Sequence, residues 1–547
     1  MEVYEDGPAP VIKAISDQIQ FVQTINDAVQ YDESQCKLSP GERVLAMVIN
    51  ALEDRKPLYH IEEYYEHKDV EKLFGEGISA DDLNDDALGR ALDKLAEAGG
   101  WEVYGDVVLE VIRREECPVR RLHGDTTSVS VQGDYEGPDD AELTITHGHS
   151  KDHRPDLKQF KYGVVVNEQG IPVDGTVNDG NQADGTWNRE LIRSLRDRLN
   201  QPEKPLLYTA DSKLVSETNL ELLESKDMEF VSRLPGTFGL DEQLKQRAIR
   251  EDDWEDVGAV AKRNQAAEYQ VTSYEEPLYG QPYRFVVVQS TTASESNEET
   301  IQRELKQTKS ELTEAIQTLQ NREFACREDA TRAMEEFKTT HSTPCFELNV
   351  RVIEDEKPIK RETRGRPPEG WEREYKTVYR CEGCVTQKDE AVQNRRAIKR
   401  CFVLITSVRS KQWLSDREVL EEYKQQNRVE VHFEFLKDPK QIGSVYLEKP
   451  HRVQALGYVL LMALLLYTII QNRVRSALAD ADEPMQMDGG VTSFCPTGRR
   501  VLERLEPMRV VKTRGDPTRQ FPGNLDVPYR VLELLGVQPD VYRNVDA

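Results

Sequence analysis

The feature that most constrains the fold is a long apolar run from Ala455 to Ile470. It holds sixteen residues, and Arg452 and Arg473 stand close to its two ends. A helix that spans a bilayer needs about 20 predominantly apolar residues in a row. Because this run is shorter and is bounded by charge, we expect a helix buried in a globular protein and no membrane partner.

The charge balance of the chain is acidic. Lys and Arg number 72 against 99 Asp and Glu, so the net charge is -27. Proteins that bind DNA usually attract its phosphates through Lys and Arg, so one interpretation is an acidic protein without a polyanionic partner. The other interpretation, which we favour, is a DNA-binding protein from a cytoplasm of very high salt, where an acidic surface keeps the protein soluble. At about 1 M salt the Debye length is only about 3 Å, so local contacts decide binding.

The first residues and the cysteines indicate the cellular compartment. The segment MEVYEDGPAP lacks the basic and apolar regions that are typical of a signal peptide, and eight cysteines are scattered along the chain. We therefore expect a cytoplasmic protein with reduced thiols. A chain of 547 residues is too long for one compact core, and its length predicts about three domains or one domain with a large insertion.

Residues 1–115 predict a helical N-terminal domain. Ser39 is followed by Pro40 and Glu42, which suit the N-cap, N1 and N3 positions of a helix. A second helix, DDALGRALDKLAEAG, is expected to stop at Gly99. Two such helices could bind the ends of a DNA element, or they could be packing units only. The sequence leaves both interpretations open.

Residues 116–235 predict a mixed α/β unit. Alternating or short apolar runs indicate strands, and a helix from Gly185 and another in ETNLELLESK separate the later ones. The predicted strands lie in RLHGDTTSVSVQG, ELTITHG, FKYGVVVNEQGIPV with a turn at Gln169-Gly170, PLLYTADSK and EFVSRLP.

Residues 236–405 predict a mixed α/β insertion. It contains a strand pair, the charged stretch ETIQRELKQTKSELTEAIQTLQNREF, expected to form a helical hairpin or a coiled segment, and a basic patch. This patch, Lys357 to Arg400, holds thirteen Lys and Arg against seven Asp and Glu. Residues 406–478 return to helices, and 479–547 predict a helical C-terminal tail.

Two carboxylates stand at places where a strand would bury them. Asp125 lies within the polar and apolar alternation of HGDTT, and Asp211 follows the apolar run LLYTA. A lone aspartate of this kind is most often a helix cap or a turn residue. A pair on neighbouring strands is more suggestive, because a buried carboxylate needs a partner and Mg²⁺ prefers hard oxygen ligands.

A third carboxylate is offered by Glu430. On a helix it would share one face with Tyr423, Gln426, Phe433 and Lys437, at spacings of three and four residues. The alternation of Val429, Val431, Phe433 and Phe435 instead indicates a strand. The residues alone do not decide between the two.

Several motifs together resemble one family. THGHSKDHRPDLKQ after HGDTT, the TADSKLVS block, and Y-x6-E-x2-F-x2-LK before a long apolar helix are similar to the DDE transposases of insertion sequences, the IS-four-type superfamily and within it the IS-sixteen-thirty-four subgroup. The resemblance implies a ribonuclease-H-like core with a large insertion. It also implies a triad of Asp125, Asp211 and Glu430 that binds two Mg²⁺ or Mn²⁺ ions, with Glu430 on a helix.

The same resemblance implies double-stranded DNA as substrate, cleavage at element ends followed by strand transfer, and a homodimer in the DNA complex. The expected DNA contacts are Tyr423 and Lys437, with Arg428, Lys151 and Arg154 as further candidates. Gln426 stands where the family usually has Arg, and Arg428 would substitute for that phosphate contact. An inactive transposase relic that still binds DNA is the main alternative.

Other motifs compete for a function. His147, His149, Asp152 and His153 nearly match the zinc motif of metallo-β-lactamase-type hydrolases, with one residue too many.

Two further motifs lie in the basic region. Arg364-Gly365-Arg366-Pro367 resembles the core of an AT-hook, in which Arg364 and Arg366 would enter the minor groove of DNA. Cys381 and Cys384 could be half of a zinc site, although an unligated pair of thiols is the simpler interpretation.

Overall fold

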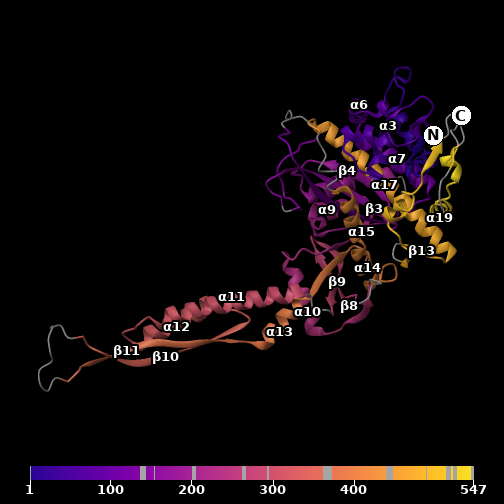
Figure 1. The fold of residues 1–547 in the computed structure, drawn as a ribbon. Helices are drawn as coiled ribbons and strands as arrows, with labels where there is room; N and C mark the ends of the chain where they lie inside the picture. The colour runs from indigo at the N-terminus through magenta and orange to yellow at the C-terminus, as the bar shows by residue number, and fades with distance from the viewer. Residues whose placement is uncertain are drawn as a thin grey trace.

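The computed structural model describes residues 2–135, 143–152, 154–199, 205–260, 266–291, 295–360, 372–438, 447–487, 490–512, 519–520 and 526–543. Helices from both ends of the chain surround one side of a mixed sheet, and a long arm projects from the other side (Figure 1). The arm is drawn in pink and orange, and the N-terminal helices are drawn in indigo.

The N-terminal region is helical, apart from the short strand β1 (Glu2–Tyr4). Its α-helices are α1 (Ala9–Gln18), α2 (Phe21–Ala28), α3 (Pro40–Leu52), α4 (Ile61–Tyr65), α5 (Val70–Phe74), α6 (Asp85–Glu97) and α7 (Gly100–Arg114). Ser39 and Glu42 form a reciprocal capping box at the start of α3, which confirms the expected helix start. Gly99, with φ 82°, separates α6 from α7 in a backbone conformation that favours glycine.

The apolar run forms the middle of α17 (Pro450–Ala481), which lies against α3, α6 and α7. Within the described ranges, α17 is the helix long and apolar enough to cross a membrane, but 83% of its most apolar window is buried in the protein. The expectation of a buried core helix is therefore confirmed. Since α3 and α6 both pack on α17, packing is their observed role, and contact with DNA stays a prediction.

The described residues place nine strands in one mixed sheet, in the order β4-β3-β2-β5-β6-β12-β9-β8-β7. The first five along the chain are β2 (Arg121–Val131), β3 (Lys158–Asn167), β4 (Pro172–Asn178), β5 (Leu206–Ala210) and β6 (Met228–Arg233). β3 runs antiparallel to both of its neighbours, β2 and β4, and β5 and β6 run parallel to β2. Helices α8 (Asp184–Leu199) and α9 (Glu217–Ser225) connect the later strands, as expected.

One predicted strand is wrong. Among the described residues of ELTITHG, only an isolated bridge from Thr146 to Gln159 is present. The backbone there is held by single contacts, such as the bond from the Thr144 amide to the Asp179 carboxylate at 2.7 Å. Its alternation of polar and apolar residues reflects burial of Leu143 and Ile145 without a strand partner.

The segment 236–405, expected to be one insertion, contributes to two parts of the molecule. Helix α10 (Gly239–Glu251) covers the sheet, while strands β7 (Glu255–Ala259), β8 (Glu268–Leu278), β9 (Gln281–Ser290) and β12 (Cys401–Thr406) extend it. Only the segment between β9 and β12 leaves the sheet and forms the arm.

The arm consists of helices and a long hairpin (Figure 1). Its elements are α11 (Glu295–Gln320), α12 (Arg327–Thr340), β10 (Phe346–Pro358), β11 (Tyr375–Gln387) and α13 (Asp389–Lys399). The charged stretch is helical, as expected, but it forms the single helix α11 against β11 rather than a helical hairpin or a coiled segment. The helices cover one face of the β-hairpin with a small core around Phe337, Val350 and Cys381. Cys384 is exposed, because side chains three residues apart on a strand point to opposite faces.

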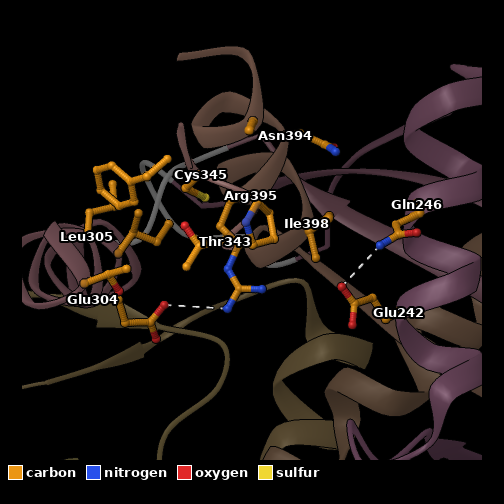
Figure 2. Close-up of a pocket in the computed structure, with 14 residues that line it drawn as sticks. Glu242, Gln246, Glu304, Leu305, Thr343, Cys345, Asn394, Arg395 and Ile398 are labelled. Carbon is orange, nitrogen blue, oxygen red and sulfur yellow. Dashed lines mark hydrogen bonds and ion pairs between the residues drawn. The ribbon is translucent and has the colours of Figure 1, made fainter. Parts of the chain in front are cut away.

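The base of the arm encloses a pocket of about 410 Å³, between α10, α11 and α13 (Figure 2). Arg395 points across it toward Glu304, 3.6 Å away. Arg396 and Glu298 lie beside this pair at 2.7 Å. The predicted basic patch is therefore partly neutralised by acids of α11. Arg364 and Arg366 lie outside the described residues.

The C-terminal region returns to the N-terminal one. Helices α18 (Gly498–Glu503) and α19 (Asp526–Leu535) lie against α17. The short strands are β13 (Met485–Gln486), β14 (Thr492–Ser493), β15 (Val510–Lys512) and β16 (Arg519–Gln520). β1 pairs with β15, and the Tyr542 hydroxyl donates to the Gly7 carbonyl at 2.6 Å. Between the last strand of the large sheet, β12, and α17 the chain forms α14 (Asp416–Gln425) and α15 (Asn427–Leu436).

Candidate active site

Asp125 on β2 and Asp211, the residue directly after β5, lie at neighbouring positions of the sheet. β2 and β5 are parallel, and the last paired residues along them are Gly124 and Ala210. Asp125 and Asp211 come directly after this pair, and Asp211 is still in an extended conformation. Because neighbouring strands lie about 5 Å apart, the two carboxylates reach the same edge of the sheet. The sequence expectation of a carboxylate pair on adjacent strands is met.

The strand that carries Asp125 can approach β5 closely because residue 124 is a glycine. A side chain there would begin 2.3 Å from the Tyr208 hydroxyl. That hydroxyl is fixed by a hydrogen bond to the Asn188 amide oxygen at 2.8 Å. The Tyr208 ring is fully buried, so it cannot easily move aside.

A further carboxylate, Asp184 at the start of α8, joins the pair. It accepts a hydrogen bond of 2.8 Å from the Thr126 hydroxyl, next to Asp125 on β2. Burial raises the pKa of Asp125 to about 6, and the negative charges of Asp211 and Asp184 act in the same direction. Burial also raises the pKa of Asp211, again with a contribution from Asp184. A site that holds several carboxylates at low exposure favours a bound cation.

Lysines supply positive charge to these carboxylates. The Lys151 ammonium lies 3.5 Å from Oδ1 of Asp125 and 3.9 Å from Oδ2 of Asp184. Lys161, on β3, lies 3.1 Å from Oδ1 of Asp184 and donates to the Gln182 carbonyl at 2.7 Å. Lys151 was expected near DNA, and its ammonium group lies among the carboxylates of this site.

Glu430 lies on α15, so the helical assignment is confirmed and the period-two strand signal is wrong at this place. Glu430 is exposed, whereas Asp125 and Asp211 are partly buried. Burial raises the pKa of the Tyr423 hydroxyl, and the negative charges of Asp211 and Glu430 add to this rise. Among the residues described, no group of three or more His, Cys, Asp and Glu is assembled to hold a metal ion. The expected triad is therefore brought to one region without forming a closed set of ligands.

The other expected DNA contacts are engaged within the protein. Lys437 lies 2.6 Å from Oδ1 of Asp152, and Arg154 forms a paired contact with Asp156 at 2.7 and 2.8 Å. The guanidinium of Arg428 donates to the Glu168 carbonyl.

Gln426, at the departure from the family motif, is 9% exposed and lies between α14 and α15. It therefore offers little surface to DNA.

The histidine motif does not form a site in the described residues. His147 and His149 are both exposed, and His153 lies outside the described residues. The alternative of a zinc hydrolase therefore receives no support.

Sequence reasoning missed Asp184 and Lys161. The signal for Asp184 was its place at the start of a predicted helix, where an acid is usually a cap. Lys161 lies in the apolar strand FKYGVVV, and its pairing with a buried carboxylate depends on the tertiary arrangement.

Comparison with known proteins agrees with this geometry. A family model described as a transposase DDE domain matches residues 125–466, from Asp125 to the middle of α17. A second model, described as a domain of unknown function (DUF4277), matches residues 8–109. No curated protein matches the chain. The first match covers more than half of the sequence and includes Asp125, Asp211 and Glu430, and so the chain belongs to the family of transposases with a DDE domain.

Proposed function

We propose that the protein cleaves DNA at the ends of an insertion sequence and joins the freed ends to target DNA, in a reaction that depends on divalent metal. The observation that carries this proposal is the adjacency of Asp125 and Asp211 on parallel strands, with an ammonium group among the carboxylates. The subgroup named from the sequence motifs and the ribonuclease-H-like core remain part of the proposal. The subgroup rests on the sequence motifs, and the mixed sheet with acids at adjoining strand positions supports the ribonuclease-H-like core.

The residues present fit a hard divalent cation. Asp125 and Asp211 offer carboxylate oxygens, the ligand type that Mg²⁺ and Mn²⁺ prefer. The Lys151 ammonium lies 3.5 Å from Asp125, and this contact with a positive charge supports a cation at that place. Asp125 and Asp211 would hold the metal, and Glu430 would complete its coordination. When bound, two such ions would activate the attacking oxygen and stabilise the leaving oxygen in phosphoryl transfer.

The protein's own residues would position the DNA. Lys437 at the end of α15 and the half-buried Tyr423 on α14 flank Glu430 and would orient the phosphate backbone. Positioning accounts for much of the acceleration in phosphoryl transfer, because little covalent help from the protein is needed.

We also propose that the protein acts on two DNA ends as a homodimer. The arm of α11, α12 and the hairpin is a candidate for contact with the second copy or its DNA, since it extends far from the sheet (Figure 1). Light scattering of the protein with and without end-containing DNA would test this assembly.

The experiment that tests the function compares wild type with Asp125→Asn, Asp211→Asn and Glu430→Gln on DNA that carries the element ends, with Mg²⁺ or Mn²⁺ in high KCl. Asp156→Asn and Glu434→Gln are matched controls, because both residues are exposed and Glu434 lies one turn beyond Glu430 on the same helix.

The expected result is metal-dependent nicking that the first three variants lose and the controls keep. Equal nicking by wild type and Asp125→Asn would place the chemistry elsewhere. Binding of the ends without cleavage by wild type would instead favour an inactive relic.

A further inference from the structure

Lys151 is held at the acidic site by the chain around it. It follows the isolated bridge at Thr146, and its backbone amide donates to the Ser128 hydroxyl on β2 at 2.8 Å. The next residue, Asp152, accepts a bond of 3.4 Å from Ser130 on the same strand. This loop is thus attached to the strand that carries Asp125, and the position of Lys151 is defined by that attachment.

The ammonium group of Lys151 is surrounded by oxygen atoms. It donates to the backbone carbonyl of Thr126, lies 3.3 Å from the Thr126 hydroxyl, and lies 3.5 Å from Oδ1 of Asp125. Oδ2 of Asp184 is 3.9 Å away. An arrangement of hard oxygens around one positive charge is what a divalent cation would also require.

The two cations cannot occupy this place together. Two positive groups among the same carboxylate oxygens would repel each other strongly at a separation of a few ångströms and low exposure. On the basis of the function proposed above, we propose that Lys151 is a built-in counter-ion that occupies the acidic site without metal and leaves it when a divalent cation binds.

The neighbouring lysine has a different role. The Lys161 side chain is only 8% exposed, compared with 32% for Lys151, and it is fixed by the Gln182 carbonyl and by Asp184. Lys161 therefore remains as the partner of Asp184, while Lys151 has a path to solvent. Asp184 keeps a neutralising charge when Lys151 departs, so the exchange of cations does not leave it unpaired.

The exchange has a measurable cost for metal binding. Part of the binding free energy of the metal is used to displace the ammonium, so removal of that charge tightens binding. Calorimetric titration of DNA-free protein with Mn²⁺ measures this affinity for wild type, Lys151→Met, Lys151→Arg and Asp125→Asn. Lys158→Met is the matched control, since Lys158 donates to the Asp134 carbonyl and pairs with Val131, six residues along β2 from Asp125.

Lys151→Met is expected to bind Mn²⁺ about tenfold more tightly than wild type, because a repelling unit charge has been removed. Lys151→Arg, which keeps the charge, and Lys158→Met are expected to stay near wild type. Thermal melts provide a second measurement: the rise in melting temperature on adding Mn²⁺ should be larger for Lys151→Met than for wild type.

Unchanged or weaker Mn²⁺ binding by Lys151→Met, while wild type binds in an Asp125-dependent manner, would overturn the counter-ion role and leave the proposed function intact. Tighter binding by Lys151→Arg as well would also overturn it, because charge would then not be the cause. Absence of Asp125-dependent Mn²⁺ binding in every variant would overturn the metal site itself, and with it both proposals.

Discussion

The ammonium of Lys437 lies 2.6 Å from Oδ1 of Asp152, and this pair joins the helix of Glu430 to the loop of Lys151. The two side chains are 23% and 31% exposed, so they are accessible to a DNA phosphate. The pair therefore holds Lys437 near the site in the absence of DNA. A phosphate group would have to compete with Asp152 for it.

This competition predicts opposite effects of two substitutions on DNA binding. Lys437→Met should weaken binding and reduce the slope of log affinity against log salt by about 1, as expected for one lost phosphate contact. Asp152→Asn should strengthen binding, because Lys437 is released. Fluorescence anisotropy over a salt series measures both. A similar loss of affinity in both variants would show that the pair only stabilises the local structure.

The ion pair between Asp93 and Arg452 predicts a pH dependence of stability. Two hydrogen bonds of 2.6 Å from Arg452 and a bond from His451 lower the pKa of Asp93 to about 2. The folded-state pKa lies below the ordinary value of 3.8, so the contribution is complete above that pH and is lost as the pH falls toward 2.

Asp93→Asn should therefore lower the free energy of unfolding at pH 7 by about 1 kcal/mol, with allowance for the partial exposure of the pair. Urea unfolding at pH 7, 5, 4 and 3 measures the difference from wild type, which should shrink below pH 4. A difference that stays constant over this range would mean that Asp93 acts through its shape rather than its charge.

A buried ion pair lies in the part of the sheet that carries the arm. Arg284 on β9 and Asp416 on α14 are 2% and 3% exposed, with Nη1 and Oδ1 3.3 Å apart. Arg284→Met should lower the free energy of unfolding by about 1–3 kcal/mol, because the bond from Arg284 to the Leu414 carbonyl and its pairing with Asp416 are lost, while Asp416 keeps the Lys411 ammonium at 2.6 Å. Chemical denaturation measures the loss. Arg409→Met is the control: its pair with Glu275 is about half exposed, and little change is expected.

Much of the core could be predicted from local patterns. The cap at Ser39, the buried helix around Ala455–Ile470 and the strands that carry Asp125 and Asp211 all depend on residues close in sequence. At Glu430 the local pattern failed. Val431 breaks the apparent alternation, since it is 58% exposed while Val429 and Phe433 are buried on α15. The family resemblance correctly predicted a helix at Glu430.

Other parts depend on contacts between distant residues, which periodicity does not report. The position of Lys151 follows from its attachment to Ser128, 23 residues earlier. The addition of β7, β8, β9 and β12 to the sheet follows from the pairing of β12 with β6. Asp184 acquires its role because α8 begins beside Thr126, a relation that no spacing in the sequence indicates.

Gly124 predicts a sharp steric effect on the site. Gly124→Ala would place a methyl group 2.3 Å from the buried Tyr208 hydroxyl, so β2 or the ring must shift. We expect a loss of about 1–3 kcal/mol of stability and a marked loss of nicking, since Asp125 is the next residue. Melting curves and the cleavage assay measure these effects. Gly236→Ala, with open space around the added carbon, should change neither.

The net charge of -27 predicts that stability increases with salt. Repulsion among exposed acids opposes the compact state at low ionic strength, and added salt screens it over about 10 Å at 0.1 M and about 3 Å at 1 M. The melting temperature should therefore rise steadily as KCl increases from 0.1 M to molar concentrations, and folding should be incomplete at the lowest salt. Circular dichroism melts over a KCl series measure this. A melting temperature independent of KCl would contradict adaptation to high salt. Screening by salt would then not explain how a protein of this negative charge binds DNA.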